Sequence, residues 1–178
     1  MNPLTELNAL VELFPEEQPL IAHAEHVTGP LMPEPYRRML AHDHHMTVTM
    51  EEFHHSPVDV HVLAEREVDG LYCRKILLTK QGTDCVVQFG IIRFDFSFVT
   101  PEVKAEILAR ETPLGRVLIR HNVLRHIDLG ALLRIEAGPG LAKHLQMTAG
   151  ETTYGRLATI FCNGRPAVDL FEITAPLA

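Results

Sequence analysis

The chain has 178 residues, and its 16 Lys and Arg against 23 Asp and Glu give a formal net charge of −7 with the 11 histidines neutral. A general nucleic-acid binder needs a basic face, and no run of basic residues occurs in this sequence, so nucleic acid and anionic membrane surfaces are not expected as partners. The 46% hydrophobic and 22% charged residues are typical of a globular protein that can fill a core. We therefore expect one domain with a small molecule as its partner.

No stretch contains the roughly 18 uncharged apolar residues that a membrane span requires. The N-terminal segment is acidic where a secretory signal would be basic, which predicts a cytoplasmic protein. The three cysteines, Cys73, Cys85 and Cys162, have no Cys-x-x-Cys spacing. This favours reduced thiols over a disulfide framework or a structural zinc site.

The first 45 residues are predicted to be helical. Apolar residues at helical spacing indicate a helix over residues 4–14, and a second short helix over residues 36–41 follows a group of prolines. We interpret residues 1–45 as a helical cover over a core formed by residues 46–175. A third helix, with Asp43 as its expected N-cap, carries Met46 and Met50 on one apolar face.

From Val58 onward the apolar period changes to two, which is typical of a half-buried strand. Turn signals at residues 69–70 and 81–82 separate this strand from two further strands, over residues 71–79 and 85–98. Three strands joined by short turns predict an antiparallel meander.

The second half of the chain begins with two helix starts, at Thr100 and Thr112, each followed by proline at the first helical turn. An extended segment over residues 123–135 ends at a Gly-Pro-Gly break. Residues 154–162 and 167–173, joined by an Asn-Gly turn, predict a β-hairpin. These elements add up to an α+β fold: a single domain with an antiparallel β-sheet flanked by helices, which we expect on one side of the sheet.

Six of the 11 histidines fall within twenty positions: His42, His44, His45, His54, His55 and His61. Their spacing does not aim two imidazoles from adjacent helical turns at one ion, and no carboxylate stands at helical spacing beside them. We interpret the cluster as a polar helix face and expect no metal site.

Four charged side chains stand on strand faces that are otherwise apolar: Arg74, Arg93, Arg156 and Glu172. A buried arginine requires a partner, and either an internal ion pair or a bidentate contact with a ligand carboxylate would supply it. Three arginines and one carboxylate on apolar faces suggest an interior site for an organic anion. Motifs for nucleotide cofactors, serine hydrolases and zinc proteases are absent from the sequence.

The sequence resembles the chorismate pyruvate-lyases, also called 4-hydroxybenzoate synthases, including a bacterial branch formerly regarded as uncharacterised. The resemblance rests on four segments in order, which together span about residues 38–175: residues 43–47, residues 74–78, residues 112–116, and residues 154–172. It implies a single α+β domain that converts chorismate to 4-hydroxybenzoate and pyruvate without a metal or organic cofactor, as part of aromatic acid biosynthesis.

The resemblance also implies residue roles. Glu172 and Arg74 would be the catalytic residues, Arg74 holding a substrate carboxylate, and a second group would bind the substrate: Met46, Thr47, Leu114, Gly115, Arg93 and Arg156. Glu172 lies six residues after Pro166, one more than the family's acid. Either a β-bulge absorbs this extra residue or Glu172 is not the equivalent residue, because a one-residue slip turns a strand side chain to the other face.

Two alternatives to the enzyme remain. The same fold is known as the effector-sensing domain of a class of transcription regulators, where it only binds a ligand. On this alternative the chain would be a non-catalytic binding protein for a small aromatic or cyclic carboxylate. Such regulators carry an N-terminal winged helix-turn-helix, for which the first 45 residues have neither the basic charge nor the length. The other alternative is a diverged homologue that has lost the activity, and fold resemblance alone does not decide between these functions.

Overall fold

The structure of the chain, a computed structural model, describes residues 2–177. Its helices are α1 (Pro3–Val11), α2 (Tyr36–Leu40), α3 (Met46–His54), α4 (Pro101–Leu108), α5 (Leu114–Arg120) and α6 (Pro139–Leu145), with short 3-10 helices η1 (Gly29–Leu31) and η2 (Phe96–Phe98). The strands are β1 (Ile21–Val27), β2 (Val58–Val68), β3 (Leu71–Lys80), β4 (Val86–Phe94), β5 (Arg125–Ala137), β6 (Thr152–Cys162) and β7 (Arg165–Thr174). No helix within this part of the chain is long and apolar enough to cross a membrane.

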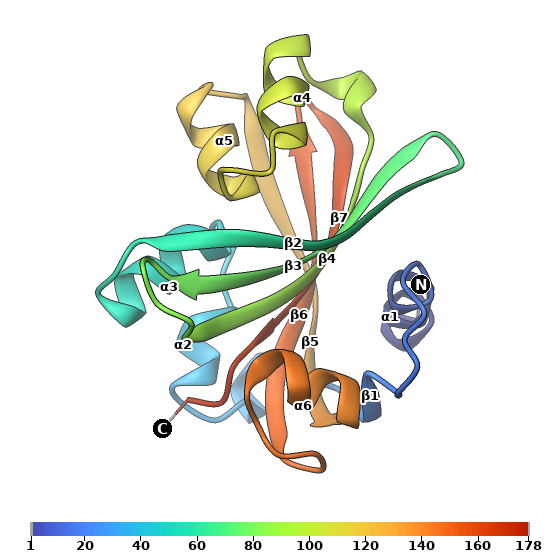
Figure 1. Cartoon of the computed structure of the whole chain (residues 1–178), viewed down its shortest axis with the longest axis vertical. Coiled ribbons are helices and arrows are strands. Elements are labelled where there is room, and N and C mark those ends of the chain that lie inside the picture. Colours follow the sequence, from blue (N-terminus) through green and yellow to red (C-terminus); the bar gives the residue numbers. More distant parts are fainter. Residues whose placement is uncertain (1, 178) are drawn as a thin grey trace.

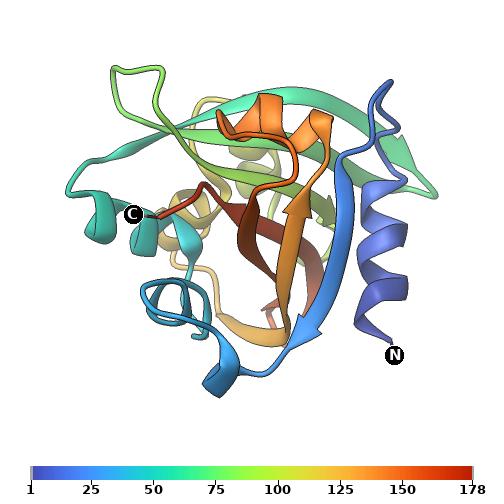
Figure 2. The ribbon, with the colours of Figure 1, turned by 90° about the horizontal axis from the view of Figure 1, so that it is seen from below.

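All seven strands form one antiparallel sheet in the order β1-β5-β6-β7-β4-β3-β2, which confirms the predicted α+β fold class. The sheet is strongly curved (Figure 2). One face packs against α2, α3, α4 and α5, and the other face packs against α1 and α6 (Figure 1). The helices therefore cover both faces of the sheet. The prediction that they lie on one side only is wrong.

The predicted hairpin turns form as expected. Asp69 and Gly70 join β2 to β3 with φ of 52° and 77°, and Asn163 and Gly164 join β6 to β7 with φ of 54° and 78°. Two consecutive residues with positive φ match the twist of the flanking strands, which is why Asp-Gly and Asn-Gly dipeptides are favoured there.

Two elements were missed by the sequence reading. Residues 21–27, within the segment predicted to be a helical cover, form edge strand β1, which pairs with β5. Its side chains repeat one half-buried and two exposed positions, so the period of two that identifies a strand is absent. Helix α6 begins at the proline of the predicted Gly-Pro-Gly break, because proline is well accommodated in the first helical turn.

Helix α3 begins one residue after His45, which occupies the N-cap position without a side-chain hydrogen bond. The expectation that Asp43 caps this helix is wrong. The first N–H groups of an α-helix have no acceptor within the helix, so the start of α3 offers donors to its surroundings. This end of α3 lies over the sheet.

A β-bulge separates the two halves of the β6–β7 ladder. Phe161 pairs with Pro166 and Ile160 pairs with Val168, so Ala167 is the extra residue on β7. β7 therefore carries one more residue than β6 between these two pairs. The bulge places Glu172 on the sheet face that packs against α2 to α5.

Candidate functional site

A pocket lies between the sheet and the N-terminal ends of α3 and α5. Its volume is about 420 Å³, part of which is open to solvent. Its lining is His45, Met46, Thr47, Val60, Arg74, Ile76, Leu78, Gln88, Ile92, Pro113, Leu114, Gly115, Arg156, Ile160, Leu170 and Glu172. A mostly apolar chamber with a few convergent polar groups is typical of a site for a small organic ligand.

Seven of the eight predicted site residues line this pocket: Met46, Thr47, Arg74, Leu114, Gly115, Arg156 and Glu172. They come from α3, α5, β3, β6 and β7. Period-two geometry placed the charged strand residues on the pocket face, and the helix starts supply the others.

The eighth residue, Arg93, does not reach the pocket. It shares a face of β4 with Phe89 and Ile91, and both of these side chains belong to the core on the opposite side of the sheet. Arg93 is paired directly across the sheet with Asp169, to which its Nε and Nη2 donate hydrogen bonds of 3.1 and 2.7 Å. Arg93 therefore belongs to an ion pair on the far face.

Arg74 is buried in the pocket wall, with 1% of its surface exposed. Its Nη1 donates a hydrogen bond of 3.2 Å to the backbone oxygen of Ile107, and its Nε has no partner among residues 2–177. It forms no ion pair with any residue that the structure describes, because the nearby carboxylate of Glu65 is bound by Arg110 at 2.8 Å and by the Tyr72 hydroxyl at 2.6 Å. Arg74 is thus a buried cation with unused donors.

Burial lowers the pKa of Arg74, while the neighbouring Tyr72 and Glu65 act in the opposite direction. The guanidinium nevertheless stays charged in proteins. An unpaired charge in such a place is costly, and an anionic group that entered the pocket would relieve the cost.

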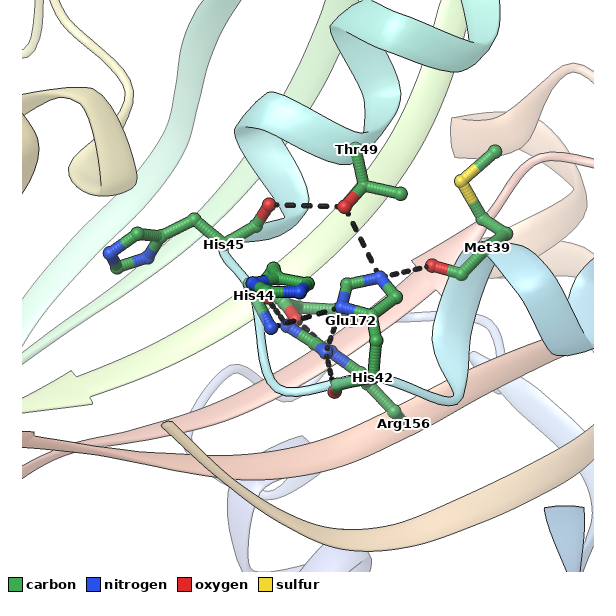
Figure 3. A network of polar contacts seen from close by, with 7 residues as sticks. All are labelled: Met39, His42, His44, His45, Thr49, Arg156 and Glu172. Atoms are coloured by element: carbon green, nitrogen blue, oxygen red, sulfur yellow. Dashed lines mark hydrogen bonds and ion pairs between the residues drawn. The ribbon is translucent and has the colours of Figure 1, made fainter. Parts of the chain in front are cut away.

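Arg156 has the opposite environment, although it is equally buried. Its Nε donates to Glu172 Oε2 at 2.8 Å, its Nη1 to the backbone oxygen of His42 at 2.9 Å, and its Nη2 to the backbone oxygen of His44 at 2.9 Å. Figure 3 shows these contacts converging on the guanidinium. Arg156 therefore neutralises Glu172 and fixes the segment that leads into α3.

His42 belongs to this network and is not part of a solvated helix face, which corrects the interpretation of the histidine cluster. Its Nε2 lies 2.7 Å from the backbone oxygen of Met39, and its Nδ1 accepts a hydrogen bond of 3.0 Å from the His44 N–H (Figure 3). Burial, followed by the charge of Arg156, lowers the pKa of His42 to about 4. The imidazole is therefore neutral at neutral pH, with its proton on Nε2.

His45 stands at the pocket wall, and sequence reasoning treated it only as a member of the histidine cluster. Its Nε2 accepts a hydrogen bond of 2.8 Å from Arg125 Nε, which leaves the ring proton on Nδ1. Burial and the charge of Arg125 lower its pKa to about 4. Gly115 packs against it so closely that an added Cβ would lie 3.1 Å from His45 Cβ and 3.0 Å from Thr47 Oγ1. The missing side chain at Gly115 allows α5 to approach the start of α3.

Gln88 is a second lining residue that the sequence reading missed. It lies on β4, is 3% exposed, and its Oε1 has no partner among the described residues. The signal was present, because Gln88 is the lone polar residue within the otherwise apolar segment from Val86 to Ile92.

No three histidine, cysteine, aspartate or glutamate side chains within residues 2–177 come close enough together to hold a metal ion. The charged groups of the pocket are Arg74, Arg156 and Glu172, with His45 neutral. Their sum is one positive charge, so the arrangement is suited to a small anion.

Comparisons with known proteins connect this fold to regulators of transcription. No family model matches the sequence, and no curated protein matches it significantly. Among solved structures, the ligand-binding domain of a candidate GntR-family transcriptional regulator from Bordetella bronchiseptica is 12% identical, with a TM-score of 0.52 over 66% of this chain and 85% of that one. A candidate transcriptional regulator from Bacillus subtilis, YydK, is 14% identical, with a TM-score of 0.51 over 66% of this chain and 57% of that one. A gene product from Staphylococcus aureus is 12% identical, with a TM-score of 0.50 over 66% of this chain and 82% of that one.

At these identities the likeness establishes a shared fold, the fold of regulator domains. The prediction of a chorismate pyruvate-lyase is wrong, because the solved structures that share this fold are described as domains of candidate transcriptional regulators, and none of those named here is described as a lyase. The expected conversion of chorismate to 4-hydroxybenzoate and pyruvate, and the expected role in aromatic acid biosynthesis, are wrong for the same reason. The same finding removes the exclusion of nucleic-acid partners, because this fold occurs in proteins described as candidate transcriptional regulators.

Proposed function

We propose that the chain is a binding domain for a small organic anion, which it holds without chemical turnover. The observation that carries the proposal is Arg74, a fully buried guanidinium without an acidic partner within residues 2–177, in the wall of a mostly apolar pocket. Buried charges in native proteins are normally paired. An anionic ligand supplies the pair that the chain lacks.

A carboxylate fits this pocket better than a phosphate monoester. The pocket carries one net positive charge, from Arg74 and Arg156 against Glu172, and a carboxylate carries one negative charge. A phosphate monoester carries about −1.5 to −2 at neutral pH and would add uncompensated charge close to Glu172. The apolar lining, which includes Ile76 and Leu114, suits a cyclic or aromatic body attached to the carboxylate.

The shared fold supports a sensing role for this binding. A structural neighbour is itself the ligand-binding domain of a candidate GntR-family regulator. We infer that this chain likewise senses its ligand and passes on the bound state to a partner that acts on transcription.

Binding can be tested by isothermal titration calorimetry with cyclohexanecarboxylate and its neutral amide. The carboxylate should bind, the amide should not, and Arg74→Met should weaken binding by about 30- to 150-fold, which corresponds to the loss of roughly 2–3 kcal/mol of charged hydrogen bonding. Arg93→Met is the matched control, because this arginine lies on the opposite face of the sheet. Equal binding of acid and amide would contradict the proposal, and so would the appearance of a new compound in the NMR spectrum of the incubated ligand.

A further inference from the structure

The pocket contains a second unsatisfied polar group besides Arg74. Within residues 2–177, three buried side-chain atoms have no hydrogen-bond partner: His54 Nε2, Arg74 Nε and Gln88 Oε1. Two of the three line this single pocket. Buried polar atoms in native proteins are nearly always hydrogen-bonded, so two orphans in one chamber indicate groups that await a ligand.

The sheet register separates these two groups along the pocket floor. Arg74 lies opposite Ile92, and Gln88 lies opposite Leu78, which places them four residues apart on neighbouring strands. From the rise per residue and the strand spacing, their backbones are about 14 Å apart. The long side chains therefore mark opposite ends of the pocket.

The floor between the two ends is formed by Ile76, which lies midway between Arg74 and Leu78 on β3 and lines the pocket. Ile76 packs over Gly90 of β4, where an added Cβ would lie 3.4 Å from Ile76 Cδ1. A ligand that spans the pocket would lie against Ile76.

We propose that Gln88 determines specificity, by selecting acids that carry a hydroxyl group at the end remote from the carboxylate. This inference rests on the proposed function, since it takes Arg74 as the carboxylate partner. A hydroxyl both donates and accepts, so it satisfies either orientation of the Gln88 amide. An acid without the hydroxyl leaves the amide desolvated and unpaired, and such a site discriminates strongly against it.

The test compares two acids, trans-4-hydroxycyclohexanecarboxylate and cyclohexanecarboxylate, by calorimetry on the wild type and on Gln88→Met, which keeps the side-chain length without the amide. The wild type should prefer the hydroxy acid by at least about tenfold, equivalent to 1.4 kcal/mol. Gln88→Met should lose this preference and bind the plain acid at least as tightly as the wild type does, because no amide is left unpaired in the variant. A thermal melt of Gln88→Met at or above the wild-type Tm verifies that the fold is intact, and Gln88→Leu serves as a second apolar variant.

The outcomes separate the two proposals. Binding of both acids through Arg74 with no preference for the hydroxyl, or a preference that persists in Gln88→Met and Gln88→Leu, overturns the role of Gln88 and leaves the anion-binding function standing. Failure of the wild type to bind either acid overturns both. Loss of the preference in the variants, with the affinity for the plain acid retained or raised, supports both.

Discussion

Two arginines on one face of the sheet, Arg74 and Arg156, are equally buried and have opposite environments. All three nitrogens of Arg156 are hydrogen-bonded, to Glu172 and to two backbone oxygens of the segment before α3 (Figure 3). Arg74 has one backbone hydrogen bond and an unpaired Nε. The comparison teaches that burial alone does not identify a binding residue. The number of donors that the folded chain leaves unused separates a structural arginine from one available to a ligand.

The largest effect is expected from Arg156→Met. This change leaves the Glu172 carboxylate buried without its counter-charge and frees the backbone oxygens of His42 and His44. It should lower the free energy of unfolding by about 3–5 kcal/mol, measured by urea denaturation. The double variant Arg156→Met/Glu172→Met removes both charges and should recover much of the loss. A loss below about 1 kcal/mol in the single variant would place Arg156 among weakly stabilising surface pairs and would remove the contrast with Arg74.

The opposite sign is expected from Arg74→Met. Removing an unpaired buried cation should raise the free energy of unfolding of the ligand-free protein by about 1–2 kcal/mol, in the same urea experiment. A gain in stability together with a loss of ligand affinity is the signature of a residue retained for binding. If Arg74→Met instead destabilises the chain as strongly as Arg156→Met does, the two arginines are both structural.

The strands that could be predicted from the sequence are those marked by a local pattern of apolar residues and by turn dipeptides. Alternation of apolar residues and the Asp-Gly and Asn-Gly turns identified β2, β3, β4, β6 and β7 close to their observed bounds. Strand β1 escaped because, as an edge strand, it shows no alternation, and α6 escaped because its proline occupies a position that starts a helix as readily as it ends a strand.

The same reasoning predicted most residues of the site. It could not tell which of the charged residues face the pocket and which are paired within the protein. Period two placed Arg74, Arg156 and Glu172 on one face, but the set also included Arg93, which the same arithmetic puts on the other face with Phe89 and Ile91. The hydrogen-bond partners of Arg156 could not be predicted from the sequence, because two of them lie more than 100 positions away along the chain. Gln88 carries no charge, but an amide in an otherwise apolar strand is as strong an anomaly as a charged group and could have been recognised from the sequence.

A smaller effect, confined to the Arg156 side of the comparison, is expected on acidification. His42 has a pKa of about 4 in the folded chain, below its ordinary value of 6.5, so the unfolded chain binds more protons between these values. Stability is therefore complete above about pH 6.5 and is lost as the pH falls toward 4, by about 1 kcal/mol for this half-buried group after allowance for solvent screening. His45, with the same direction of shift, adds to the slope.

His42→Gln should reduce this pH dependence of Tm, because glutamine stays neutral and can keep a donor near the Met39 oxygen. His44→Gln is the control: the side chain of His44 is 77% exposed, and its replacement should leave the slope unchanged. Protonation at Nδ1 of His42 would oppose both the His44 N–H and the Arg156 guanidinium, 3.5 Å away, so the residues around 42–50 should exchange amide hydrogen faster at pH 5 than at pH 7. If amide exchange accelerates first around Arg74, the acid-sensitive contact lies near Arg74 and not near Arg156. That result would contradict the assignment of the pH dependence to the contact between His42 and Arg156.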